Sequence, residues 1–264
     1  MGCQISTHAH PTGGNETRCY NSNVTSTMHL LEEGLAQLGL DLTHHQLEDF
    51  HRYYEELASW NQRVNLTRII DYSQVQTRHF LDSLTVSLVL PDEVKEGGRI
   101  VDVGTGAGFP GLPLKIAFPG LRLALVESVG KKAAFLNHMV EVLKLSDVEV
   151  HHGRAETLAH EPSMREGFDV ALARGLAPLR TLAELTLPFC RVGGVLIAHK
   201  KGNITREVQD ARNAVSLLGG ELLEQRPVEI EGLKDGRLLI LIRKLTATEA
   251  KYPRRSGIPR KRPL

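Results

Sequence analysis

Residues 102–113 read DVGTGAGFPGLP, and this stretch decides the fold. It begins at the end of a short, mostly apolar run, residues 100–103. After that run, glycines alternate with other residues at Gly104, Gly106 and Gly108. Without a Cβ, such residues allow the backbone to approach a ligand closely. A strand that leads into a glycine-rich turn and then a helix is typical of an open α/β sheet, in which ligands lie at the carboxyl ends of the strands.

Outward from this loop, short apolar runs alternate with segments of helical periodicity. We expect strands at residues 100–103, 121–126, 148–151, 168–172, 195–198 and 238–242. We expect helices between most of them, at residues 113–118, 131–143, 179–187 and 204–218. This alternation predicts the α/β class, with a Rossmann-like, mostly parallel sheet covered by helices on both faces.

The segment before the sheet has a different character. Apolar residues recur at helical spacing between Leu47 and Trp60, and Thr43 with Gln46 predicts a capping box for that helix. A second helix is expected at residues 79–90, before Pro91. The sequence thus predicts four parts, which are a disordered polar extension (1–27), an N-terminal helical element (28–92), an α/β domain (93–250) and a basic tail (251–264).

Composition narrows the class of protein. The chain has 264 residues, of which 41% are hydrophobic and 24% charged, typical of a globular domain. No apolar run approaches the roughly 18 residues that a membrane span needs, so we expect no membrane-spanning segment. Three cysteines form no disulfide framework and favour a reducing, cytoplasmic location. The net charge is only +1, yet residues 251–264 hold six basic residues and no acid, which indicates an anionic partner at one place.

Two kinds of ligand fit the glycine-rich loop. Gly106, Gly108 and Gly111 match the dinucleotide fingerprint of an oxidoreductase, but Asp102 stands just before the glycines. A carboxylate is unfavourable beside a pyrophosphate and favourable beside the ammonium and sulfonium groups of S-adenosylmethionine. Glu127 ends the next strand, where its carboxylate can accept hydrogen bonds from ribose hydroxyls of either ligand. The loop therefore favours S-adenosylmethionine, with Asp102, Gly106 and Glu127 among the cofactor contacts.

Distinctive motifs run in order from about residue 30 to the end of the chain. They are NLT at 65–67, RHFLDSL at 78–84, the glycine-rich loop, VES at 126–128, GRAE at 153–156, AR at 173–174 and YPRRSGIPRKRP at 252–263. In these motifs the chain resembles the bacterial 16S ribosomal RNA guanine-N7 methyltransferase family known as GidB or RsmG. One departure is local, since the chain reads Ala-Arg-Gly-Leu at residues 173–176, where the family more often has polar and aromatic residues around the arginine.

The resemblance implies a class I S-adenosylmethionine-dependent methyltransferase domain with seven strands behind a small N-terminal helical element. It implies methyl transfer to N7 of a guanine in the decoding-centre loop, with 16S rRNA or the small ribosomal subunit as partner. The cofactor contacts that it implies are Gly104, Phe109, Ala155, Glu156 and Arg174. Arg174 would lie beside the transfer site. Because N7 of guanine carries no proton, we expect no catalytic acid or base, only positioning and desolvation.

Candidate RNA contacts fall into two groups. Asn65, His79 and Asp82 are candidates for the guanine pocket, because a carboxylate or amide can bind the edge of the base. His79 and Asp82 also stand one helical turn apart, so a purely structural pairing remains open. The second group is cationic and would neutralise phosphates, on an extended tail for all but Lys200. Its members are Lys200, Arg254, Arg255, Arg260, Lys261 and Arg262.

The remaining features indicate no further chemistry. His151 and His152 are neighbours on a strand and point to opposite faces, so we expect no metal site. Cys190 is expected to be a buried packing residue, and a monomer is the default. Three alternatives stay open, namely a small-molecule methyltransferase for which the tail is dispensable, a non-catalytic RNA-binding protein of the same fold, and a dinucleotide oxidoreductase.

Overall fold

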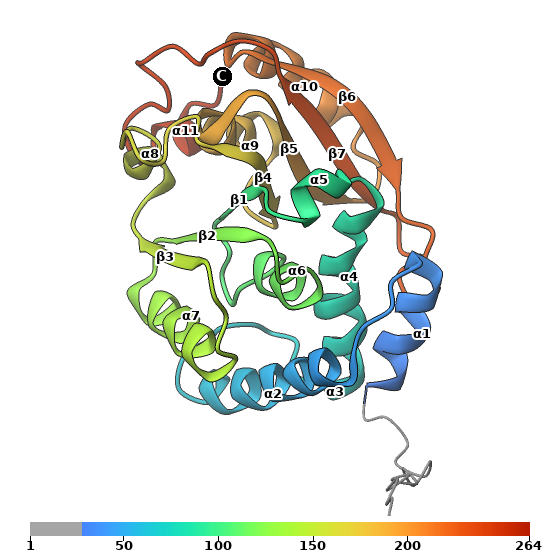
Figure 1. The fold of residues 1–264 in the computed structure, drawn as a ribbon. Coiled ribbons are helices and arrows are strands. Elements are labelled where there is room, and N and C mark those ends of the chain that lie inside the picture. Colours follow the sequence, from blue (N-terminus) through green and yellow to red (C-terminus); the bar gives the residue numbers. More distant parts are fainter. Residues whose placement is uncertain (1–27) are drawn as a thin grey trace, which may run out of the picture.

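A computed structural model describes residues 28–264, so the predicted extension 1–27 lies outside the described residues. These residues form a seven-stranded sheet in the order β3-β2-β1-β4-β5-β7-β6 (Figure 1). The strands are β1 (Arg99–Val103), β2 (Arg122–Glu127), β3 (Val148–His152), β4 (Phe168–Arg174), β5 (Cys190–Lys201), β6 (Gly220–Pro227) and β7 (Arg237–Lys244). Strands β1 to β5 run parallel, whereas β7 is antiparallel to β5 and β6. This confirms the predicted mostly parallel sheet.

The sequence prediction missed β6, which lies at the edge of the sheet. Its residues read GELLEQRP, and most of them are exposed or half-buried. An edge strand with so few buried side chains carries little of the apolar signal from which a strand is predicted. The edge strand is joined through β7, so it does not change which loops meet at the carboxyl ends of the parallel strands.

Helices cover both faces of the sheet (Figure 1). The predicted helices are confirmed as α6 (Gly111–Ala117), α7 (Gly130–Val142), α9 (Leu179–Thr186) and α10 (Thr205–Leu217), to which α8 (Ala155–Leu158), the 3-10 turn η3 (Leu187–Phe189) and α11 (Ile258–Lys261) are added. Alternate residues of a strand point to opposite faces. Accordingly Ile100 packs in one apolar core with α6 and α7, while Val101 packs in the other with α9 and α10.

The N-terminal helical element packs on the α6–α7 side and shares its core. Its segments are α1 (His29–Leu38), α2 (His44–Asn61), α3 (Tyr72–Val75), the π-helix η1 (Gln76–Leu81), α4 (Asp82–Leu84), the 3-10 helix η2 (Thr85–Leu88) and α5 (Asp92–Lys95). The capping box of Thr43 and Gln46 is confirmed. The helix expected from residue 79 instead begins at Tyr72 and widens into a π turn, a feature frequent at functional sites. None of the helices among the described residues is long and apolar enough to span a membrane.

The basic tail does not extend from the surface as predicted. It folds back onto the domain, with Tyr252 and Pro259 buried and α11 beside α8 and α9 (Figure 1). Apolar residues interleaved with the basic ones are the reason, because they give the segment something to bury. The tail therefore lies near the loops that follow β3 and β4.

Candidate functional site

The loop after β1 needs glycine at Gly104. This residue has a positive φ of +71°, and a Cβ there would lie 2.5 Å from Cδ1 of Leu176. Its backbone N–H donates to the carbonyl of Val126 at 2.8 Å, which ties the loop to the end of β2. The glycine-rich turn is thus a tightly held backbone surface at the carboxyl edge of the sheet.

Asp102, which is predicted to meet the cofactor's ammonium, has no exposed surface in the folded chain. Its side chain is fully buried beneath the loop, where Oδ2 accepts hydrogen bonds from the Thr105 hydroxyl at 2.6 Å and the Gly111 N–H at 2.9 Å. Its role is therefore to join the two ends of the turn. Burial raises the pKa of this carboxyl to about 6, and the two hydrogen bonds only partly oppose that rise.

Asp102→Asn tests this buried carboxyl. The folded protein holds the Asp102 proton to a higher pH than the unfolded chain, so stability falls as pH rises through the window between the ordinary and raised pKa values. Relative to Asp102→Asn, the wild type is expected to lose about 3 kcal/mol of unfolding free energy between about pH 4 and about pH 7. Urea unfolding at several pH values measures this. Parallel pH profiles for the two proteins would contradict it.

Glu127 ends β2 and lies over the same loop. Its two carboxylate oxygens accept hydrogen bonds from the Gly106 N–H at 3.0 Å and the Val129 N–H at 2.7 Å. Each oxygen keeps a further lone pair, which is the acceptor capacity that a ribose diol requires. The geometry is compatible with the predicted contact.

The loops after β1, β2 and β3 meet at one cavity, which is also the place where the predicted adenine contacts lie. Its lining includes Gly104, Ser128, Ala155 and Glu156. The structure thus brings predicted cofactor residues from the ends of β1 and β3 together, in the crevice where open α/β sheets bind ligands.

Arg174, at the end of β4, connects the sheet to the N-terminal element. Its guanidinium donates to Oδ2 of Asp82 at 2.8 Å and to Nδ1 of His79 at 3.1 Å. It also lies 5.0 Å from the ring centroid of Phe109, and His79 stacks on the same ring at 4.5 Å. Arg174, Phe109, His79 and Asp82, which we call the arginine cluster, come from three separate motifs of the sequence.

The protonation of the arginine cluster follows from its burial. Burial, together with the nearby Arg174, lowers the pKa of His79 to about 4, so the ring is neutral at pH 7. Since Nδ1 accepts from Arg174, the proton is on Nε2, which lies 2.9 Å from the Thr67 hydroxyl oxygen. Both ring nitrogens of His79 are engaged, and the side chain is held in one orientation.

Asp82 has a second cationic partner that sequence reasoning missed. Arg237, the first residue of β7, lies 2.5 Å from Oδ1 of Asp82. Burial raises the pKa of Asp82, but attraction to His199, Arg174 and Arg237 outweighs it and holds the pKa below its usual value. Both oxygens of Asp82 are paired to arginines, so the structural pairing that the sequence left open is present. No motif marks Arg237 in the sequence, because only the strand order brings it near.

Outside the arginine cluster, some of the predicted RNA contacts are paired with acidic side chains and the others are exposed. Lys200 donates to Glu207 at 2.5 Å, and Arg254 donates through Nε and Nη2 to the buried Glu184. These two partly exposed cations are paired with acidic side chains of the protein, so part of their charge is already balanced within the fold. The exposed ones are Asn65, Arg255, Arg260, Lys261 and Arg262.

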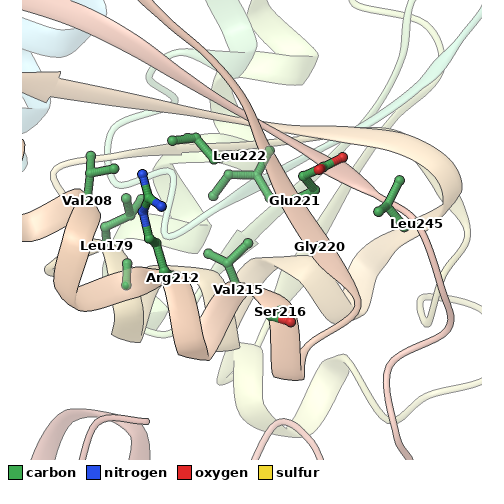
Figure 2. A pocket seen from close by; sticks show the side chains of 11 residues that line it. Leu179, Val208, Arg212, Val215, Ser216, Gly220, Glu221, Leu222 and Leu245 are labelled. Atoms are coloured by element: carbon green, nitrogen blue, oxygen red, sulfur yellow. The ribbon is translucent and has the colours of Figure 1, made fainter.

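Other features of the described residues carry no part of this site. A cavity of about 410 Å³ lies between α10 and β6 (Figure 2), and apolar side chains line it together with Arg212, Ser216 and Glu221. It contains none of the predicted site residues. Burial raises the pKa of the Cys190 thiol to about 12, which fits a packing role. No group of three or more His, Cys, Asp or Glu side chains within residues 28–264 is arranged to hold a metal ion.

Comparisons with known proteins bear on the family and the fold. A family model described as "GidB: rRNA small subunit methyltransferase G" matches residues 46–231. The chain is 50% identical over 237 residues to "Ribosomal RNA small subunit methyltransferase G" of Dehalococcoides mccartyi (strain CBDB1), covering 90% of this chain and 100% of that protein. It is 51% identical over 226 residues to the protein of the same name from Roseiflexus sp. (strain RS-1), covering 86% and 95%. A crystal structure of a mutant of MtNAS matches the fold with a TM-score of 0.51 at 17% identity, over 84% of this chain and 81% of that one.

Proposed function

The chain belongs to the rRNA small subunit methyltransferase G (GidB) family, and from that premise we propose that it transfers a methyl group from S-adenosylmethionine to N7 of a guanine in the decoding-centre loop of 16S rRNA. The observation that supports the proposal is the meeting of Gly104 of the glycine-rich loop with the Ala155–Glu156 segment at one cavity. Glu127 is hydrogen-bonded to the same loop, and the arginine cluster lies beside it. The small ribosomal subunit is the proposed partner, the protein acts as a monomer, and its proposed location is the cytoplasm.

The cavity, of about 50 Å³, has room for only part of the proposed cofactor, and the loop beside it would take the rest. Gly106 has no atom within 4 Å of where a Cβ would stand, so the loop leaves open space above its backbone. Glu127 would accept the two ribose hydroxyls with its remaining lone pairs. The backbone at Ala155 and Glu156 would bind the adenine edge. The methionine part would then run over Gly104 towards Phe109 and Arg174.

Methyl transfer to guanine N7 needs no general acid or base from the protein. The bound cofactor supplies an electrophilic methyl group, and the lone pair of guanine N7 displaces it without release of a proton. Arg174 would therefore help to position the guanine beside the methyl group and to exclude water from that place. Its position is set by Asp82, His79 and the ring of Phe109. His79, neutral and bonded at both nitrogens, is suited to support rather than to proton transfer.

The exposed cations would bind the RNA. Arg255, Lys261 and Arg262 are exposed on the folded tail, and phosphate neutralisation by such residues makes affinity fall with salt. Asn65 is exposed beside Thr67, the partner of His79, and is the proposed contact to the guanine. The RNA would thus approach from the side where the tail and the N-terminal element are both accessible.

Small ribosomal subunits from cells that lack this gene provide the direct test. They would be incubated with the protein and labelled S-adenosylmethionine, and the labelled nucleoside identified by mass spectrometry. We expect label in 7-methylguanosine at a single decoding-loop position. Label in another nucleoside would contradict the N7 assignment. Absence of label, with S-adenosylhomocysteine still bound in calorimetry, would favour a small-molecule substrate instead.

A further inference from the structure

The folded tail reaches the cavity that the glycine-rich loop lines. Arg260 of α11 belongs to the lining, together with Gly104, Ala155 and Glu156. Its guanidinium donates through Nη2 to the carbonyl of Leu176, in the loop after β4, at 3.3 Å. A residue from the far end of the chain therefore closes a cavity whose other walls follow β1 to β4.

Several buried groups hold the tail in this place. The carboxylate of Glu184, which is fully buried, accepts from the backbone N–H of Arg254 at 2.9 Å and from its guanidinium at 2.8 and 2.6 Å. The Thr181 hydroxyl donates to the carbonyl of Pro259 at 3.1 Å. Charge-assisted hydrogen bonds to a buried carboxylate are among the stronger side-chain interactions. The tail is thus anchored on both sides of the turn that precedes α11.

A third anchor lies in the cavity wall itself. Oε1 of Glu156 accepts the backbone N–H of Gly257 at 2.9 Å, and Gly257 is the residue immediately before α11. Glu156 is also one of the two residues proposed to meet the adenine edge. The position of Arg260 and the position of the adenine contacts are therefore set by the same side chain.

We propose that the tail is a wall of the cofactor site and that Arg260 covers the adenine ring of the bound S-adenosyl compound. The guanidinium is planar and stacks well on aromatic faces. Arg260 is exposed apart from its single bond to Leu176, so one face of the side chain is free to meet a ligand. This inference rests on the proposed function and deepens it, because it moves Arg260 from RNA binding to cofactor binding.

Isothermal calorimetry with S-adenosylhomocysteine tests the proposal on the full-length chain. Arg260→Ala is expected to weaken binding about tenfold, in line with the free energy of a cation–π contact at a partly desolvated site. Arg260→Lys keeps the charge but loses the planar fork, and an intermediate affinity is expected. Arg206→Ala is the matched control, since Arg206 is an exposed arginine on α10 away from the cavity, and its affinity should equal that of the wild type.

The outcomes separate this inference from the proposed function. Equal affinity of the wild type and Arg260→Ala would overturn the role of Arg260, and a loss confined to rRNA affinity would return the residue to RNA binding. A wild type that binds no S-adenosylhomocysteine would overturn the cofactor assignment and the inference together. Thermal unfolding without ligand checks the fold. Unchanged unfolding with weakened binding supports the proposal, whereas an equal loss of affinity and stability in Arg260→Ala and Arg206→Ala would contradict it.

Discussion

Arg174→Ala is expected to lower the rate of methyl transfer about 100-fold, the cost of misplacing reacting groups by roughly 1 Å. The substitution removes the donor to His79 and Asp82 and the cation over the Phe109 ring. All three side chains then lose one of the contacts that hold them at the proposed transfer site. Single-turnover methylation of small subunits, at saturating S-adenosylmethionine, measures the effect on chemistry apart from product release.

Arg174→Lys distinguishes charge from geometry. Lysine keeps a positive charge beside Asp82, but it cannot present two donors in the plane of a guanidinium. We expect the lysine variant to recover stability more fully than rate. If Arg174→Ala retained the wild-type single-turnover rate, the assignment of Arg174 to the transfer site would be wrong.

Asp82→Asn is expected to destabilise the protein by about 3 kcal/mol, the usual cost of breaking a buried ion pair by removal of one partner. Arg174 would lose its anionic partner in a largely buried place, and Arg237 would keep only its ion pair with Asp235. Urea unfolding at neutral pH measures the change. Asp210→Asn is the control, since Asp210 pairs with Arg206 at 4.0 Å on the exposed face of α10, and loss of such a surface pair should cost less than about 1 kcal/mol.

The contribution of Asp82 also depends on pH. Its pKa is lower in the folded protein than the ordinary 3.8, so its stabilisation is present above that value and is lost as pH falls through the lowered folded pKa. The difference in unfolding free energy between wild type and Asp82→Asn should therefore shrink on acidification below about pH 4. A difference that stayed constant down to strongly acidic pH would show that the carboxylate charge is not what stabilises this place.

Local signals in the sequence were enough to predict the sheet and most of its helices. The loop DVGTGAGFPGLP identified the end of the sheet at which a ligand would bind. The buried strands were predicted from their apolar runs. The exposed edge strand β6 lacked that signal. The π turn at Gln76–Leu81 was also missed, because the apolar pattern of one helix does not reveal a single widened turn.

The sequence predicted individual residues of the site but not the contacts between them. Arg174, His79 and Asp82 were all singled out, yet the sequence could not show that Asp82 is shared with Arg237, since that contact depends on β7 lying beside β5. Asp102 was assigned by charge complementarity to the cofactor, whereas hydrogen bonding inside the loop decides its place. The tail was read from its charge alone, although its buried Tyr252 and Pro259 determine where it lies.

The contacts that complete the site join parts of the chain that are very distant in sequence. Arg174 and Asp82 are 92 residues apart, and Gly257 and Glu156 are 101 apart. Closing such long loops carries an entropic cost that only the packing of the complete domain offsets. The complete site is therefore present only when the whole sheet and the tail are assembled. An S-adenosyl ligand that recognises this site therefore binds the native chain in preference to its folding intermediates.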